Sequence, residues 1–404
     1  MSTGLSIRAK HVRPSSTLAI TDKAKRMKAD GLDVVSFGAG EPDFPTPANI
    51  CEAGKKAIDD GFTKYTAASG TVELKKAVCD KFKRFNGLDY EPKQIVISNG
   101  GKHSLTNIFT AIINPGEEVV IPAPFWLSYP EMVRLAGGVP VIVKCDRENN
   151  YKITPEQLKN ACNDRTKAFV LNNPNNPTGM VYTKAELSEL AKIIVEEDIY
   201  CVSDEMYENI VYGDERPVSI ASFNKEIYDR TITCSGLAKA YSMTGWRIGY
   251  TGSAPEIAKA MGAIQSHQTS NPNSIAQKAA LEALNGPQDA VETMRQEFEK
   301  RNEYMYERIS KMPHISMVKP MGAFYAFVDV SDTFELDYRG LRVHNVFEFA
   351  RILLDDYYCA VVPCTDFGFD THIRLSYATS MENIKKGLDR IEEFLKGLDD
   401  VDYV

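Results

Sequence analysis

A lysine in an apolar, glycine-containing segment is the strongest candidate nucleophile in the chain. Lys239 lies in residues 236–250, among mostly small and apolar neighbours. Burial there would lower the pKa of its amine and leave it free to act as a nucleophile. The alternative is a solvated surface charge, as most lysines are. Arg247 follows eight residues later, and its planar guanidinium suits bidentate phosphate binding.

A short glycine motif, Asn-Gly-Gly-Lys at residues 99–102, precedes a helical pattern that runs from Leu105 to Ile113. Glycines let the backbone approach a ligand closely, and the free N–H groups of a helix N-terminus point at an anion. The motif therefore favours a phosphate site. A simple turn is the alternative, because so short a motif is weak on its own.

Two further positions carry polar side chains in apolar surroundings. Asp204 and Tyr207 are three residues apart, so one helical turn would point both toward the same site. A buried aspartate needs a cationic partner, and here it would keep a heteroaromatic nitrogen protonated while Tyr207 donates to a neighbouring oxygen. The alternative is a helix N-cap at Asp204. Arg374 alternates with apolar residues on a predicted strand, either exposed at a sheet edge or binding a carboxylate.

Seven short β-branched runs between residues 94 and 251 predict the framework that positions these residues. Each run is apolar and bounded by Gly, Pro, Asn or Asp, and helical patterns such as residues 184–197 lie between them. This alternation is typical of a mostly parallel sheet with helices on both faces. The polar clusters follow the runs and should meet at the carboxyl edge of the sheet. The runs are 94–98, 118–122, 139–144, 168–172, 200–203, 230–234 and 247–251.

The pattern changes beyond residue 274. A charged helical stretch at 289–310 is expected to bridge into a smaller α+β domain, and 404 residues suit two domains. Strands are expected at 323–329 and 372–377, and helices at 346–355 and 381–398. We therefore predict an N-terminal arm with part of the small domain at 1–45, a large domain at 46–288, and the bridging helix with the small domain at 289–404.

Composition excludes several classes of function. A net charge of −8 argues against nucleic acid or an anionic membrane as the main partner. The eight cysteines form no C-x-x-C pair, which indicates free thiols in a reducing compartment. No secretory signal and no long apolar run is evident, so we expect a cytoplasmic protein. The six histidines lack ligand spacing, so no metal site is predicted.

Taken together, the motifs resemble class I/II aminotransferases of fold type I, in the subgroup of prokaryotic-type aspartate and prephenate aminotransferases. The resemblance runs nearly end to end, and the number, order and spacing of its motifs make chance implausible. It implies an α/β fold with a large seven-stranded domain and a smaller α+β domain. The motifs lie at residues 38–44, 64–74, 124–129, 173–179, 203–208, 236–250, 322–325 and 374–378.

The resemblance also implies a cofactor, pyridoxal phosphate, and roles for individual residues. Lys239 would hold the cofactor as a Schiff base and then move a proton as a base. Asp204 would pair with the pyridinium nitrogen, and Tyr207 and Asn176 would hydrogen-bond the phenolate oxygen. Trp126 would stack on the ring, where the alternative is a core aromatic.

The remaining roles concern phosphate and carboxylate groups. Three residues would surround the phosphate: Gly101, Lys102 and Arg247. Tyr65 would reach the phosphate from a second subunit, which implies a homodimer. Arg374 would fix the substrate α-carboxylate, helped by Asn176 and by the backbone of Gly40.

One departure from the family pattern concerns the phosphate region. Many relatives have serines near the reactive lysine, where this chain has Gly236 and Ala238. Ser235 carries a hydroxyl that could compensate, although its register is wrong for a simple replacement of the missing serines.

The substrate is the least constrained part of the prediction. In the subgroup, residues at the positions of Lys102 and Thr17 contact the distal carboxylate of a dicarboxylic substrate. We therefore expect an amino-group transfer from L-aspartate to 2-oxoglutarate, which forms oxaloacetate and L-glutamate. Prephenate or aromatic substrates and a C–S lyase on the same fold are the alternatives, and a non-catalytic binding protein is a further one.

Overall fold

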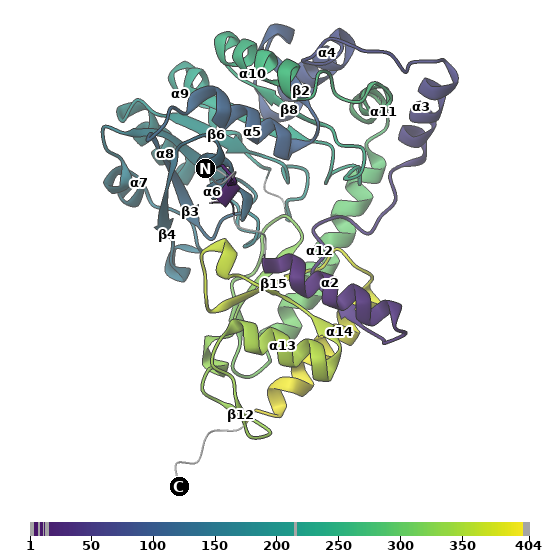
Figure 1. Ribbon diagram of the computed structural model, residues 1–404, viewed down its shortest axis with the longest axis vertical. Coiled ribbons are helices and arrows are strands. Elements are labelled where there is room, and N and C mark those ends of the chain that lie inside the picture. Colours follow the sequence, from purple (N-terminus) through teal and green to yellow (C-terminus); the bar gives the residue numbers. More distant parts are fainter. Residues whose placement is uncertain (1–3, 7–8, 11, 13–15, 214–215, 399–404) are drawn as a thin grey trace.

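The computed structural model describes residues 1–404 except for 1–3, 7–8, 11, 13–15, 214–215 and 399–404, and it leaves the side chains of 16–19 undescribed. A seven-stranded sheet forms the upper part of the molecule, in the order β2-β8-β7-β6-β5-β3-β4 (Figure 1). Only β8 runs antiparallel to its neighbours. The strands are β2 (Ile95–Ser98), β3 (Glu118–Ala123), β4 (Val139–Lys144), β5 (Thr166–Asn172), β6 (Tyr200–Asp204), β7 (Thr231–Gly236) and β8 (Gly249–Gly252).

Alternating side chains on these strands build two cores, one on each face of the sheet. On β3, Val119 and Ile121 join the cluster that holds Phe109, whereas Val120 joins the cluster that holds Leu187. This is the period of two that a strand imposes on its side chains. Both faces are therefore covered, as the apolar runs predict, and the mostly parallel seven-stranded sheet is confirmed.

Helices supply the covers. Those of the large sheet region are α3 (Ala48–Asp59), α4 (Val72–Lys81), α5 (Gly101–Ile112), α6 (Ser128–Leu135), α7 (Pro155–Ala161), α8 (Lys184–Glu196), α9 (Lys225–Arg230), α10 (Pro255–Gln268) and α11 (Ser274–Asn285). Their starts are set locally. For example, the Thr183 hydroxyl caps α8 by accepting from the backbone N–H of Glu186, whose own side chain accepts from the Thr183 backbone.

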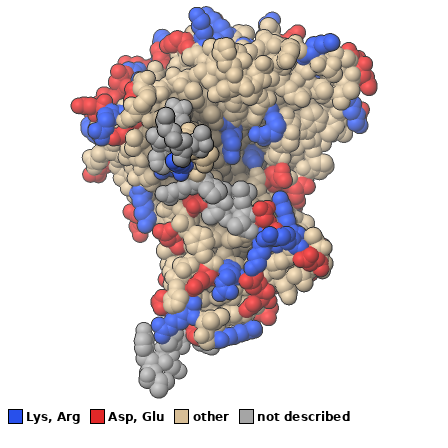
Figure 2. All heavy atoms as spheres, in the orientation of Figure 1, with Lys and Arg blue, Asp and Glu red and all other residues tan. Residues whose placement is uncertain are grey.

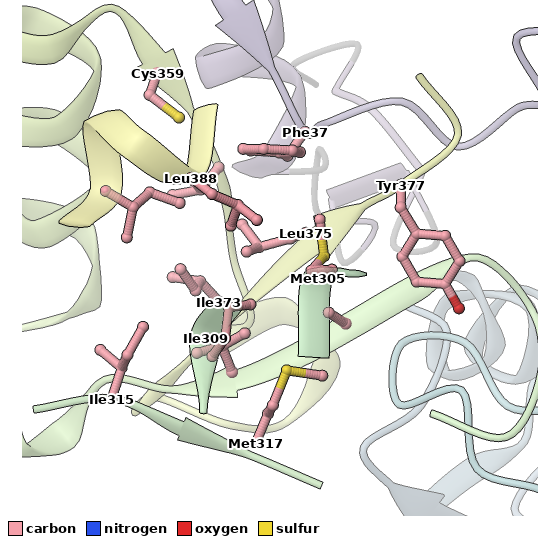
Figure 3. Close-up of a cluster of buried hydrophobic side chains, with 14 of the residues drawn as sticks. Phe37, Met305, Ile309, Ile315, Met317, Cys359, Ile373, Leu375, Tyr377 and Leu388 are labelled. Atoms are coloured by element: carbon pink, nitrogen blue, oxygen red, sulfur yellow. The ribbon is translucent and has the colours of Figure 1, made fainter. Parts of the chain in front are cut away.

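The lower part of the molecule is built on a four-stranded antiparallel sheet, β14-β15-β10-β9 (Figure 1). Its long helix, α12 (Asp289–Ile309), runs from the upper part into the lower one. Apolar side chains from α12, α14 and the sheet pack together in its core, including Met305, Ile373 and Leu388 (Figure 3). The other elements are β9 (Ser316–Met317), β10 (Tyr325–Asp329), β11 (Asp337–Tyr338), β12 (Leu341–Arg342), α13 (Val346–Tyr357), β14 (Val362–Pro363), β15 (His372–Ser376) and α14 (Met381–Lys396).

The N-terminal segment packs with the lower part. Strand β1 (Val35–Ser36) pairs in parallel with β13 (Cys359–Ala360), and the Phe37 ring lies in the same core as Leu388 (Figure 3). Helix α2 (Ser16–Ala29) precedes this strand. Residues far apart in sequence thus share one core, while the boundaries at 46 and 289 stay a prediction. No helix among the described residues is long and apolar enough to cross a membrane.

Candidate active site

A cavity of about 530 Å³ lies where the carboxyl ends of the large-sheet strands face the lower part of the molecule. In Figure 2 the surface is hollowed between the two parts, and Lys and Arg side chains gather on the upper wall of the hollow. Most of the predicted site residues line the cavity: Gly40, Gly101, Lys102, Trp126, Asn176, Asp204, Tyr207, Lys239, Arg247 and Arg374. The convergence expected from the strand ends is therefore present.

Lys239 follows β7 and projects into this cavity. Its Nζ donates to the carbonyl oxygen of Gly40 and lies 6.0 Å from the ring centre of Tyr207. Burial, together with the nearby charges of Arg374 and Arg247, lowers the pKa of the amine to about 8, although Glu41 and Asp204 oppose the shift. At pH 7 an amine with this pKa is neutral in about one tenth of the molecules, far more than an exposed lysine, and the neutral form is the one that attacks a carbonyl carbon.

Asp204 is the last residue of β6, and its carboxylate is buried. The Tyr129 hydroxyl donates to Oδ2 at 2.5 Å, and the Met206 backbone N–H donates to Oδ1 at 3.2 Å. Burial raises the pKa of Asp204 to about 6, although these hydrogen bonds and the charge of Lys239 lower it. No ion pair within 4.0 Å reaches this carboxylate from the described part of the chain. Asp204 is thus a buried acid that still needs a cation.

Arg374 faces the same cavity from β15 of the lower part. Its Nη1 donates to Oδ1 of Asn176 at 3.1 Å, and its guanidinium lies 4.5 Å from the ring centre of Tyr325. Its Nε is buried and has no hydrogen-bond partner among the described residues. The Tyr325 hydroxyl is in turn 2.9 Å from the hydroxyl of Tyr207. This chain of contacts joins the lower part to the loop after β5 and fixes the guanidinium at the cavity wall.

The N-terminus of α5 forms a tight cradle at the upper wall. Gly100 adopts a φ of 89°, and a side chain there would come within 2.5 Å of the Arg247 guanidinium. A Cβ on Gly249 would collide with the backbone of Gly101. The N–H groups of the first helical turn have no acceptor inside the helix. Glycines thus bring these donors and Arg247 close together, which suits an anionic group.

Lys102 and Trp126 lie beside each other on the cavity wall. The Lys102 Nζ is 5.0 Å from the indole ring centre, and Trp126 packs edge-on against Tyr129. Burial lowers the pKa of Lys102, and Arg247 lowers it further. Lys102 is therefore a second cationic group at the cavity, on the opposite part of the molecule from Arg374.

Two predicted site residues are not brought to the cavity of this chain. Tyr65 does not line it, and its side chain is 89% exposed. Thr17 lies in α2, but its side chain is outside the described residues, so its predicted contact stays untested. Thr21, one helical turn later on α2, does line the cavity.

Ser235 does not replace the serines missing near Lys239. Its hydroxyl donates to Oε1 of Glu208 at 2.5 Å, and Ser235 is absent from the cavity lining. The reason is strand geometry, because Ser235 and Gly236 point to opposite faces of β7.

Several cavity residues escaped the prediction of roles from the sequence. Tyr129 and Tyr325 stood inside motifs that were noted but received no role. Their hydroxyls now prove to contact Asp204 and Tyr207. These contacts could have been anticipated, because a buried tyrosine hydroxyl requires a hydrogen-bond partner. Glu41, which accepts from the Thr244 hydroxyl at 2.6 Å, carried no signal beyond its motif.

Comparison with known proteins agrees with this geometry. Residues 32–391 match the family model described as aminotransferase class I and II. The chain is 50% identical to the aspartate aminotransferase of Bacillus sp. strain YM-2, over 97% of this chain and 99% of that protein. It is 47% identical to the aspartate/prephenate aminotransferase of Cereibacter sphaeroides, over 96% and 97% of the two chains. The structure of the Thermus thermophilus aspartate aminotransferase with maleate superposes with a TM-score of 0.90, at 42% identity, over 98% of this chain and 100% of that one.

The family model covers most of the chain, and the relatives match it nearly end to end. The resemblance inferred from the motifs is therefore confirmed, as are the fold type and the enzyme class. The chain belongs to the class I and II aminotransferases, a family that uses pyridoxal phosphate.

Proposed function

We propose that this enzyme moves the amino group of L-aspartate to 2-oxoglutarate and forms oxaloacetate and L-glutamate. The observation that carries the proposal is one cavity lined by the Lys239 amine and by a cationic side chain on each of two opposite parts of the molecule, Arg374 and Lys102. Two cationic walls suit a substrate with two carboxylates. Near-full-length relatives named aspartate aminotransferase support the same substrate.

The residues present fit pyridoxal phosphate. Asp204 is a buried carboxylate that forms no ion pair within the described part of the chain, and a protonated ring nitrogen would supply the cation. The cradle formed by Gly100, Gly101 and Arg247 has room for a phosphate only because no Cβ fills it. When bound, the cofactor supplies an aldehyde that condenses with amines and a ring that takes up the electron pair released at the substrate Cα.

The chain's own residues would then divide the work between proton transfer and orientation. Lys239 Nζ, with its lowered pKa, would take the proton from the substrate Cα and pass it to the cofactor carbon. Asp204 Oδ2, fixed by Tyr129, would hold the proton on the ring nitrogen. Tyr207 and Asn176 would donate to the ring oxygen, and Trp126 would cover one ring face.

Arg374 and Lys102 would orient the substrate. The guanidinium of Arg374 would bind the α-carboxylate, beside the backbone of Gly40. Lys102, with Thr17, would bind the distal carboxylate. The Thermus relative was solved with maleate, a dicarboxylate, which supports a site for two carboxylates.

A second candidate, prephenate or another aromatic substrate, is favoured by the names of several relatives and by the indole of Trp126 on the cavity wall. A half-reaction screen separates the candidates. The pyridoxal form of the enzyme is mixed with one donor at a time, and the rate of loss of its visible absorbance is ranked. We expect aspartate and glutamate to react fastest. A clear preference for aromatic donors would replace aspartate by the second candidate, and pyruvate or ammonia formation without transfer to 2-oxoglutarate would indicate a lyase.

We also propose that the enzyme is a homodimer in the cytoplasm. Tyr65 is exposed, as are two further large apolar side chains, Ile58 on α3 and Val72 on α4. A partner surface would cover them and bring Tyr65 to the partner's phosphate cradle. Mixing Tyr65→Ala with Lys239→Ala subunits tests this, because a mixed dimer contains one site with both residues intact. Recovered activity is expected, and its absence together with an active monomer in sedimentation would refute the dimer.

A further inference from the structure

A buried polar cluster lies behind the turn that carries Asp204 and Tyr207. It consists of Lys81, Asn86, Glu205, Glu208 and Ser235, which we call the rear cluster. All five are buried, and none lines the cavity. Charged groups are costly to bury, so a cluster of three ionisable side chains in a core requires an explanation.

The rear cluster depends on an unusual piece of helix. Helix α4 ends at Lys81 and continues as a single π-helical turn, Phe82–Asn86, which Gly87 closes with a φ of 68°. Residues five apart diverge on an α-helix but lie close together on a π-helix. The π turn therefore brings Lys81 and Asn86 together, and Lys81 Nζ donates to Oδ1 of Asn86 at 2.9 Å. Such turns are frequent at functional sites.

Lys81 and Asn86, at the two ends of this turn, donate to the glutamates of the rear cluster. Lys81 Nζ donates to Oε1 of Glu208. The Asn86 amide donates to Glu208 at 2.7 Å and to Glu205 at 2.9 Å. The Ser235 hydroxyl, from β7, completes the set by donating to Glu208. The hydroxyls of Ser203 and Ser219 also donate to Glu205, so each glutamate is held by more than one donor, and three separate chain segments meet at this point.

The glutamates and the cavity residues alternate along one short turn. Asp204 and Tyr207 face the cavity, whereas Glu205 and Glu208 face the rear cluster, the spacing expected for opposite sides of one turn. The turn is closed by a backbone bond of 3.0 Å from the Glu208 N–H to the Glu205 carbonyl. Any movement of the rear glutamates therefore moves the two cavity residues.

The charges of the rear cluster are nearly balanced. One lysine faces two carboxylates, and burial together with Glu208 raises the pKa of Glu205. Replacing Lys81 by an apolar residue would leave the buried Glu208 carboxylate without its cation, which is strongly unfavourable. The turn would then relax to expose or rotate that carboxylate.

We propose that Lys81 is a positioning residue, which through Glu208 fixes the orientation of Asp204 and Tyr207 for the cofactor. This inference rests on the cofactor pocket of the proposed function and not on its substrate. A hydrogen bond from Tyr207 would draw charge from the ring oxygen and so weaken the hold of that oxygen on the proton of the Lys239 nitrogen. The pH midpoint of the visible absorbance of the bound cofactor reports this proton.

The test compares Lys81→Met with Lys152→Met, both without substrate. Lys152 is a matched control, because it is also a buried lysine with a carboxylate partner, Glu186 at 2.6 Å, but it does not touch the turn. Lys81→Met should weaken cofactor binding to the apoenzyme about tenfold and raise the absorbance midpoint by about half a pH unit. Lys152→Met should lower thermal stability alone.

Two further variants keep the proposal open to refutation. Lys81→Met combined with Glu208→Gln removes both charges and should recover part of the lost cofactor affinity. Ser235→Ala deletes one hydroxyl, so it should fold even if Lys81→Met does not, and it should shift the midpoint in the same direction by a smaller amount. If the folded variants lose only thermal stability, as Lys152→Met does, the rear cluster is merely structural and the proposal is wrong. A failure of the aspartate assignment would leave these substrate-free readouts unchanged.

Discussion

Asp204 and Glu208 lie four residues apart on one turn and are both buried, yet their charges are compensated in different ways. Glu208 pairs with Lys81 and accepts from Asn86 and Ser235, all from this chain. Asp204 accepts hydrogen bonds but has no ion pair among the described residues. A buried carboxylate that is paired with a cation of the same chain stabilises the fold. A buried carboxylate without such a partner marks a place where a ligand supplies the cation.

The largest effect on this comparison is expected from a substitution that removes the amine near Asp204. Lys239→Ala should lower turnover by more than about 10⁴-fold, because both the covalent attachment and the proton-transfer group are lost. The visible absorbance of the lysine-bound cofactor should disappear with it. Lys75→Ala is a matched control, since burial also lowers the pKa of Lys75 but it lies outside the cavity. Near-wild-type turnover in Lys239→Ala would disprove the role of this lysine.

The substitution Asp204→Asn tests the role of the Asp204 carboxylate itself. Turnover should fall by about 10²–10³-fold, because the ring nitrogen loses its anionic partner. In the cofactor-free protein the same change should stabilise the fold at pH 7 by about 1–3 kcal/mol. The reason is that the pKa of Asp204 is raised to about 6, so its stabilising contribution is full below pH 4 and lost as the pH rises through 6.

Chemical denaturation of the apoenzyme between pH 4 and 8 checks this prediction. The wild-type protein should lose stability across that window relative to Asp204→Asn, and the difference should level off above pH 7. If the difference in stability between the two proteins does not change with pH, the charge of Asp204 is neutralised by another group of the chain.

Arg374→Lys tests the opposite wall of the cavity with the charge retained. The lysine keeps the cation but loses the planar fork that donates to Asn176 and suits bidentate carboxylate binding, so kcat/KM for aspartate should fall by about 10²-fold. Steady-state kinetics would show the loss mainly in KM if the arginine only binds substrate. An unchanged kcat/KM would remove Arg374 from the substrate site.

The smallest expected effect belongs to Lys102, which is only partly buried. Lys102→Ala should slow the half-reaction of aspartate and glutamate by about tenfold at most, because partly exposed ion pairs are weak. Aromatic donors serve as the internal control and should be affected less. Equal slowing of all donors would place Lys102 at the cofactor phosphate instead of the substrate.

The sequence predicted the strands well and their surroundings less well. Six of the seven runs became strands that are largely buried, which leaves a strong apolar signal, whereas the edge strand β4 is partly exposed. Lys239, Asp204 and Arg374 were found because a charged residue stands out in such a setting. The order of the strands, the pairing of β1 with β13 and the contact of Tyr129 with Asp204 depend on tertiary packing that no local pattern records. Ser235 shows the same limit, since only its strand face decides between the cavity and the rear cluster.

The attachment point of the cofactor is the most direct test of this account. The holoenzyme is treated with borohydride, which reduces a lysine–pyridoxal linkage to a stable secondary amine, and the digested peptides are mapped by mass spectrometry. The phosphopyridoxyl group should be found on Lys239 alone. Its presence on another lysine, or on none, would contradict the central claim that Lys239 and the uncompensated Asp204 together form the cofactor site.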